Sequence, residues 1–207
     1  MYHPNLIAHY RFESTQANLG IDASGNGHHG TVYGATQGIG QFGGGADFTT
    51  NDYIEDLNFV PTVEGTWSIF VKFSSWGLSW NINKAAFCLP AGVGSIASVA
   101  DNTVRLRLYD TTFRDQNITL PNLNEYYHIV VAFSTTSRTY YLNGVEIATT
   151  SFAGYNLAYG NGLWMGSNYN QNPDRFMDGG LDEVKIFDKC YNNLIDVNLL
   201  RIGQNPR

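Results

Sequence analysis

The sequence has little charge and no concentration of positive charge. Lys, Arg, Asp and Glu make up only 14% of its 207 residues, and the formal net charge is −6. A nucleic-acid backbone is bound by gathered Lys and Arg side chains, so we expect no nucleic-acid partner. No apolar run approaches the roughly 20 residues that a membrane-spanning helix needs, so we expect no membrane insertion either.

Cysteine is also scarce. The two cysteines, Cys88 and Cys190, are too few for a fold held together by disulfides. They are either buried free thiols or one bridge between distant parts of the chain. The N-terminus lacks a basic segment followed by an apolar one, so we expect no secretory signal peptide in this chain.

Residues that favour sheets and turns are abundant. The chain is 43% apolar and contains 22 Gly, 13 Tyr and 12 Phe. This composition is typical of a sheet protein with many tight turns. The length and apolar content allow one sizeable core, so we predict a single domain over residues 1–207.

Three segments alternate with period two, which predicts half-buried antiparallel strands. They are residues 66–73, 103–110 and 126–133. In the second, Val104, Leu106 and Leu108 face the core while Arg105 and Arg107 face outward. Shorter strands are expected at residues 6–12, 31–33, 46–48, 53–57 and 162–166.

Asn143-Gly144 predicts a hairpin with a two-residue type I′ turn, because both central positions of that turn need φ > 0. The turn sets a register in which apolar residues face apolar ones. The expected cross-strand pairs are Leu142 with Val145, Tyr141 with Glu146, and Tyr140 with Ile147.

Residues 179–188, GGLDEVKIFD, are predicted to be the strand that closes the sandwich. Leu181 departs from the alternation set by Val184 and Ile186. We therefore expect the regular strand to begin only after Asp182. A short helix is expected at residues 193–200, with Asn192 or Asn193 as its N-cap.

Seven motifs, taken in order, resemble the laminin-G-like, concanavalin-A-like jelly-roll family. They are AHYRFE (8–13), DASGNGHHG (22–30), FGGGADF leading to DYI (42–54), TWSIFVKF (66–73), YHIVVAF (127–133), YLNGVE (141–146) and LDEVKIFD (181–188). The resemblance implies an all-β jelly-roll sandwich of two antiparallel sheets, with a short C-terminal helix. Residues 76–99 match the family least, so the strand register there stays open. This fold hosts lectins, adhesion domains, glycosidases and capsid components, so the resemblance fixes no single function.

The loop from Asp22 to Gly27 is a candidate calcium site. Asp22, Ser24 and Asn26 place oxygen-bearing side chains at alternate positions, as short calcium loops do. The twelfth position is a tyrosine, so a remote carboxylate would be needed. Asp182 is the candidate if the first and last strands are neighbours. The family resemblance adds the Gly45 carbonyl. The alternative is that the loop side chains form Asx turns without a metal.

Aromatic and amide side chains in loops form a candidate glycan site. Sugars present an apolar C–H face and a ring of hydroxyls, which an aromatic ring and neighbouring amides can bind. The candidates are Trp76, Trp80, Tyr155, Tyr159, Tyr169 and Asn170. The alternative for each aromatic is packing in the core or against another subunit.

No catalytic carboxylate pair is evident in the sequence. A glycosidase needs two carboxylates facing one cleft, and the glycosidases of this fold carry them at alternate positions of one strand. Glu55-Asp56 and Asp182-Glu183 are adjacent pairs, which a strand would send to opposite faces. We expect no enzymatic activity.

We therefore expect a non-catalytic recognition module that binds a carbohydrate or a glycoprotein surface in adhesion or attachment. The alternative is a structural or decoration protein in contact with other subunits of a virion or surface assembly. A glycoside hydrolase ranks third. Structural calcium is the one expected cofactor, and we expect the protein at a virion surface or in an extracellular-facing assembly.

Overall fold

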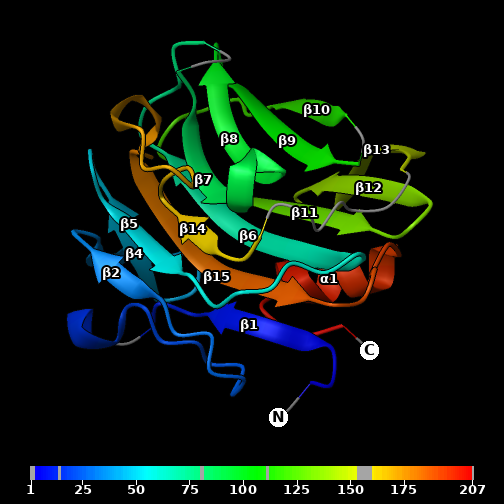
Figure 1. The fold of residues 1–207 in the computed structure, drawn as a ribbon, viewed down its shortest axis with the longest axis horizontal. Coiled ribbons are helices and arrows are strands. Elements are labelled where there is room, and N and C mark those ends of the chain that lie inside the picture. Colours follow the sequence, from blue (N-terminus) through cyan, green and yellow to red (C-terminus); the bar gives the residue numbers. More distant parts are fainter. Residues whose placement is uncertain (1–2, 14, 80–81, 111, 153–159, 207) are drawn as a thin grey trace.

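The computed structural model describes residues 3–13, 15–79, 82–110, 112–152 and 160–206. Within them, two antiparallel sheets stack into a sandwich, with one α-helix at the end of the chain (Figure 1). The jelly-roll expectation is confirmed. No helix in the described part of the chain is long and apolar enough to cross a membrane.

The first sheet, sheet A, has eight strands. In spatial order they are β13 (Val145–Ser151), β12 (Ser137–Leu142), β11 (Tyr127–Phe133), β6 (Gly65–Phe73), β15 (Gly179–Phe187), β4 (Gly44–Phe48) and β3 (Thr36–Ile39), with β1 (Leu6–Tyr10) also pairing with β15. The pairing of β1 with β15 confirms that the first and last strands are neighbours.

The second sheet, sheet B, has seven strands. In spatial order they are β10 (Phe113–Thr119), β9 (Thr103–Tyr109), β8 (Gly94–Ala100), β7 (Lys84–Cys88), β14 (Leu163–Met165), β5 (Tyr53–Asp56) and β2 (Thr31–Tyr33). In the described residues, three short 3₁₀ helices lie in the connections: η1 (Gln16–Asn18), η2 (Pro90–Gly92) and η4 (Pro173–Arg175).

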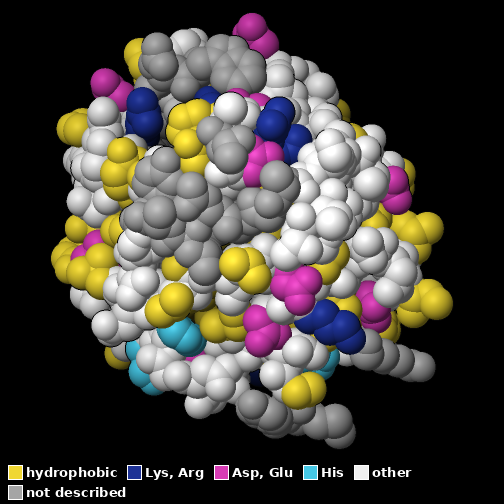
Figure 2. All heavy atoms as spheres, turned by 45° about the vertical axis from the view of Figure 1, so that its right-hand side comes forward, with side chains coloured by type: hydrophobic (Ala, Val, Ile, Leu, Met, Phe, Trp, Pro, Cys, Tyr) yellow, Lys and Arg dark blue, Asp and Glu magenta, His cyan; other side chains and the backbone are white. Residues whose placement is uncertain are grey.

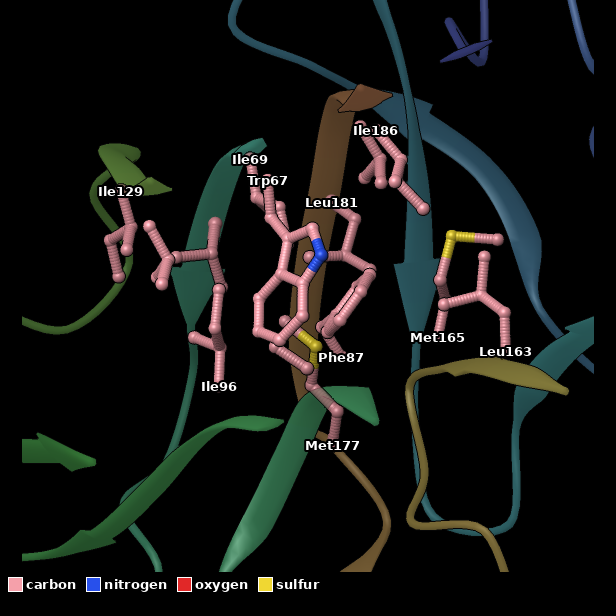
Figure 3. Close-up of a cluster of buried hydrophobic side chains, with 14 of the residues drawn as sticks. Trp67, Ile69, Phe87, Ile96, Ile129, Leu163, Met165, Met177, Leu181 and Ile186 are labelled. Atoms are coloured by element: carbon pink, nitrogen blue, oxygen red, sulfur yellow. The ribbon is translucent and has the colours of Figure 1, made fainter. Parts of the chain in front are cut away.

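The core lies between the sheets and takes side chains from both (Figure 3). Trp67 of β6 lies 4.9 Å from Phe87 of β7, measured between ring centroids. Leu181 and Ile186 reach the same core from β15. Because the inward side chains of each strand pack in this core, the outward side chains form the outer faces of the two sheets.

The β12–β13 hairpin forms with the predicted turn but with one irregularity. Asn143 and Gly144 have φ of 51° and 82°, as a type I′ turn requires. Leu142 pairs with Val145 as expected, yet Tyr140 pairs with Ala148 and not with Ile147. The register shifts between Tyr140 and Tyr141 because β13 contains an extra residue, a β-bulge.

Strand β15 begins earlier than expected and carries a bulge of its own. It runs from Gly179 to Phe187, and its pairing with β6 shifts between Asp182 and Lys185. Glu183 has φ of 46° at this point. The bulge changes the parity, so Leu181, Val184 and Ile186 all reach the core. The expectation that the regular strand begins only after Asp182 is wrong for this reason.

Two further departures lie in sheet B. The segment 76–99, whose register was open, supplies β7 and β8, which pair with each other as consecutive strands. Strand β10 was not predicted, because FRDQNIT is polar and its outer position in the sheet exposes most of it.

Helix α1 (Leu194–Arg201) begins at its predicted N-cap. The Asn193 side chain accepts a hydrogen bond from the Asp196 N–H. Val197 and Leu200 pack with Tyr141 of β12, which fixes the helix on sheet A. The chain ends lie close together, on the same side of the sandwich as β1 (Figure 1).

Candidate functional site

The outer face of sheet B carries two arginines beside its edge strand β10. Arg105 and Arg107 lie on β9, where Val104, Leu106 and Leu108 point into the core, so the arginines point outward as predicted. Across the neighbouring strand β8, their pairing partners are the small residues Ala97 and Ser95. The sheet surface beside the arginines is therefore recessed, because the side chains there are short.

This recessed region is lined by small side chains. Ala85 and Cys88 of β7 and Ser95 of β8 all line it. Cys88 is a free thiol, and burial raises its pKa to about 12, so it stays protonated at neutral pH. The thiol donates a hydrogen bond to the Leu89 carbonyl at 3.3 Å. Cys88 therefore lines the hollow as a neutral side chain and is not a nucleophile.

The loop after β14 forms the opposite wall. Phe176 makes a parallel bridge with Ala85, which holds the loop on β7. The Asn172 side chain caps η4 by accepting from the Asp174 N–H, and this turn aligns Arg175 with the hollow. The buried Asn168 side chain also accepts from the Asn172 N–H at 3.0 Å. The wall is thus fixed by the loop's own hydrogen bonds.

Together these elements enclose a pocket of about 160 Å³, which we call the arginine pocket. It is lined by Asn83, Ala85, Cys88, Ala91, Gly92, Ser95, Arg105, Arg107, Phe113, Asn168, Tyr169 and Arg175. Drug-sized ligands use pockets of roughly 300 Å³ or more. A pocket of this size suits one substituent or one edge of a sugar ring, while the remainder of a chain lies outside it.

Two aromatic rings border the pocket. The ring of Phe113 is 51% exposed, and the Arg107 guanidinium lies 4.2 Å from its centroid. Tyr169 is 36% exposed and packs edge-on against Trp164, at 6.5 Å between centroids. Trp164 is itself fixed by donating to the Glu55 carboxylate at 2.9 Å. Both exposed rings are thus held in place and offer a face to a ligand.

Positive charge predominates in the pocket. Three of the twelve Lys and Arg residues of the chain line it, and its lining contains no Asp or Glu. Asp115, on the neighbouring strand β10, binds Arg107 through two hydrogen bonds of 2.6 and 2.8 Å. Burial, followed by the charge of Arg107, lowers the pKa of Arg105 to about 10. Arg105 is still charged at neutral pH.

Two of the larger hollows are less suited to a ligand. One of about 400 Å³ is lined mainly by small side chains and backbone near η1. The other, of about 280 Å³, contains charged groups that bind one another. There Glu183 lies 2.9 Å from His9 Nε2 and 3.0 Å from Lys185 Nζ. Lys185 also donates to the Gly203 carbonyl, so the cluster ties the chain end to β15.

The predicted aromatic residues are only partly brought together. Tyr169 lines the arginine pocket, and Asn170 beside it accepts a hydrogen bond from Asn168. Trp76 packs against the core, 6.2 Å from Phe73, which is the packing alternative for that residue. Trp80, Tyr155 and Tyr159 lie outside the described residues.

The Asp22 loop has the hydrogen bonds of an Asx turn. Asp22 Oδ1 accepts from the N–H groups of His9 and Ser24, and Oδ2 accepts from the Ser24 hydroxyl and the His28 N–H. Burial raises the pKa of Asp22, but these donors outweigh it and lower the pKa below its usual value. Asn26 donates its amide hydrogens to the Leu6 and Ile7 carbonyls of β1.

The other two proposed calcium ligands also have different partners. Asp182 accepts from the N–H of Phe42 at 2.8 Å and from that of Glu183 at 2.7 Å. The Gly45 carbonyl accepts from the Gln37 side chain at 3.3 Å. Among the described residues, no three His, Cys, Asp or Glu side chains gather as a metal site. The side-chain arrangement therefore does not fit calcium, which stays a prediction for experiment.

The adjacent carboxylates likewise have separate roles. Glu55 holds Trp164 on the outer face, whereas Asp56 lies 2.9 Å from His28 Nδ1. Burial raises the pKa of Asp182 to about 7. Burial also raises the pKa of Glu183, but the bond from His9 and the charge of Lys185 outweigh it and lower the pKa to about 2.

Sequence reasoning missed most of the arginine pocket. The period-two alternation of residues 103–110 placed Arg105 and Arg107 on the outer face of the sheet, and this pattern was the sequence signal for the pocket. Phe113 lies on the strand that was not predicted, and Arg175 is brought to β9 only by the fold. On the face shown in Figure 2, Lys and Arg side chains form small separate groups among other side chains, not a continuous basic surface.

The fold defines the class as a jelly-roll β-sandwich domain, with a pocket on the outer face of sheet B. A family model described as "Concanavalin A-like lectin/glucanases superfamily", of the laminin G type, matches residues 42–193. The chain belongs to this family. No curated protein matches the chain in sequence.

Solved structures share the fold at low sequence identity. Domain 4 of AbnA, a GH43 extracellular arabinanase from Geobacillus stearothermophilus solved with arabinotriose, has a TM-score of 0.78 and 20% identity, covering 95% of this chain and 98% of that domain. The receptor binding domain of botulinum neurotoxin C/D mosaic serotype has a TM-score of 0.71 and 13% identity, covering 97% of this chain and 51% of that chain.

A third structure, the binding domain of Paraclostridial Mosquitocidal Protein 1, has a TM-score of 0.69 and 19% identity, covering 96% of this chain and 52% of that chain. The chain thus spans about half the length of these two binding domains. At these identities the likeness concerns the fold.

Proposed function

We propose that the protein is a non-catalytic binding module that recognises carbohydrate through the arginine pocket. The observation that carries the proposal is the combination, on one rigid sheet face, of two fixed aromatic rings with amide and guanidinium donors around a hollow. Aromatic faces bind the C–H side of a sugar, and the donors bind its oxygens. The solved domain bound to arabinotriose supports this proposal by analogy of fold.

We place the sugar ring on Tyr169 and Phe113, with a substituent directed into the pocket. Both residues are partly exposed, Phe113 at 51% and Tyr169 at 36%, so a sugar can stack on their rings without opening the core. The separate roles of the paired carboxylates support a binding role rather than glycoside hydrolysis. In this role the protein acts in attachment at an extracellular-facing, glycan-bearing surface.

Alanine substitution on a glycan array and in calorimetry tests the proposal. For the array sugars that the wild type binds, Tyr169→Ala should weaken the affinity by about tenfold or more, because the area for stacking is lost. Tyr33→Ala is the matched control. Tyr33 is similarly exposed, at 40%, and it stacks on Tyr53 at the opposite edge of sheet B. Equal affinities for the wild type and Tyr169→Ala would contradict the proposed site.

The alternative role as a structural or decoration protein of a larger assembly, such as a virion surface, stays a prediction. The same array distinguishes it from the first. Binding to no sugar at all, by a folded protein, would favour the structural role and contradict the binding module.

A further inference from the structure

The floor of the arginine pocket changes from apolar to polar across three neighbouring strands. Strand pairing places its outward side chains in two parallel rows that run from β7 over β8 to β9. The rows are Cys88, Ser95 and Arg107, and Ala85, Ala97 and Arg105. Each row begins with a small side chain on β7 and ends with a guanidinium group on β9. The two sides of the pocket therefore suit different parts of a ligand.

The β7 side of the pocket is apolar. Cys88 directs its thiol hydrogen to the Leu89 carbonyl, and a free thiol packs as a small hydrophobic group. Ala85 lies on the same strand, and Ala91 of η2 adds a third small side chain to the lining. A methyl group of a ligand suits this side, because burying an apolar group there is favourable.

Ser95 and Arg107 are cross-strand partners on the polar side. Ser95 is only 5% exposed and lines the pocket, and no described residue makes a hydrogen bond with its hydroxyl. Asp115 accepts from Nε and Nη2 of Arg107, and no described residue accepts from Nη1. Polar groups in buried places ordinarily have hydrogen-bond partners. These two neighbouring donors therefore leave a place for an acceptor atom of a ligand.

We propose that the sugar recognised at this pocket carries an acetamido group, which enters the pocket. Its methyl group packs on Cys88 and Ala85, and its carbonyl oxygen accepts hydrogen bonds from Ser95 and Arg107. This inference rests on the proposed function and names its ligand class. A hydroxyl group has no methyl to cover the β7 side, and a carboxylate would place a charged oxygen against that apolar side. An acetamido group matches both sides.

The size of the pocket agrees with this assignment. A volume of about 160 Å³ holds one such substituent, and the sugar ring that carries it stays outside. There the ring can stack on Tyr169 or Phe113, whose side chains border the pocket and are partly exposed. The pocket then selects the substituent, while the aromatic rings hold the sugar.

Pairs of sugars that differ only in acetamido groups test the proposal by calorimetry. The probes are tri-N-acetylchitotriose with cellotriose, which share one backbone and linkage, and methyl α-N-acetylgalactosaminide with methyl α-galactoside. At least one N-acetylated probe should bind about tenfold more tightly than its hydroxyl counterpart, since one buried methyl group and one net hydrogen bond together change an affinity by that factor. The chitosan trimer, which keeps the nitrogen atoms but lacks the acetyl groups, should not show this gain.

Two substitutions at one position test where the acetamido group binds. Ser95→Ala removes the hydroxyl and should lower the affinity for the preferred N-acetylated probe about three- to tenfold, as the loss of one neutral hydrogen bond does. Ser95→Val fills part of the pocket and should abolish the preference for that probe. Ser95 faces outward, between Cys88 and Arg107, so both changes leave the core intact, which circular dichroism checks. Ser151→Ala is the control, since it removes a hydroxyl from the exposed end of β13 in the other sheet.

The possible outcomes separate this inference from the function on which it rests. Equal affinity for N-acetylated and hydroxyl probes, with loss on Tyr169→Ala, would overturn the acetamido ligand but keep the carbohydrate module. A preference for N-acetylated probes that survives in Ser95→Val would overturn the placement of the group in the pocket. Binding to none of the probes or array sugars would overturn both proposals.

Discussion

At the scale of single residues, His128 shows how the sandwich handles a buried polar group. The side chain is 1% exposed, lies 2.9 Å from Ser68 Oγ and stacks on Phe70 at 4.5 Å between centroids. Burial, then the charges of Lys185 and Arg201, lowers its pKa from 6.5 to about 3. The imidazole is therefore neutral in the folded protein at physiological pH.

This makes stability depend on pH in a defined direction. Below pH 6.5 the unfolded chain binds a proton at His128 that the folded protein does not bind, so stability is lost as pH falls from about 6.5 toward 3. The loss is at most about 1.4 kcal/mol per pH unit for this group. Urea unfolding of wild type and His128→Gln at pH 7, 6 and 5 should show a shallower decline for the variant. Parallel declines would mean that the pKa of His128 is the same in the folded and unfolded states.

At the scale of elements, the closing strand β15 depends on a glycine at its first position. Gly179 has φ of 149°, and a Cβ placed there would lie 1.9 Å from the Lys72 carbonyl oxygen of β6. The close approach of two backbones leaves no room for a side chain. This strand also has β1, β4 and β6 as its hydrogen-bonded neighbours, so its displacement would open sheet A.

Gly179→Ala should therefore destabilise the protein by at least about 3 kcal/mol or prevent folding. Gly25→Ala is the matched control, because Gly25 has φ of 91° but open space around its Cβ position. It should cost only the conformational strain of a non-glycine residue, about 1–2 kcal/mol. Thermal and urea unfolding measure both. Similar losses in the two variants would mean that backbone conformation, and not the contact with β6, limits the position.

The elements also show how far sequence reasoning reaches. Strict alternation located β6, β9 and β11, and Asn143-Gly144 located the hairpin turn, because these signals are local. The bulges in β13 and β15 were not visible, because inserting one residue changes which side chains face the core without changing composition. The edge strand β10 was missed because one polar sequence can pair at a sheet edge or form a loop.

At the scale of the whole molecule, the candidate site depends on topology. Arg105 and Arg107 are close in sequence, but Arg175 and Tyr169 join them only because β14 lies beside β7 and its following loop returns over the sheet. No local pattern signals this arrangement. The predicted neighbours β1 and β15 did come together, yet Asp22 and Asp182 use their oxygens for different backbone groups.

The last prediction concerns calcium and the stability of the whole molecule. An ion present at 100 times its dissociation constant would add about 2.7 kcal/mol, which for a chain of this size raises the melting midpoint by roughly 5–10 °C. Both oxygens of Asp22 already accept hydrogen bonds from the protein, so we expect the midpoint to be the same in excess calcium and in chelator. Asp22→Asn should lower the midpoint equally in both conditions, because an amide nitrogen cannot accept the hydrogen bonds that a carboxylate oxygen of Asp22 accepts. A midpoint that falls by 5 °C or more in chelator, and no longer responds to chelator in Asp22→Asn, would instead establish the calcium site that the loop spacing predicts.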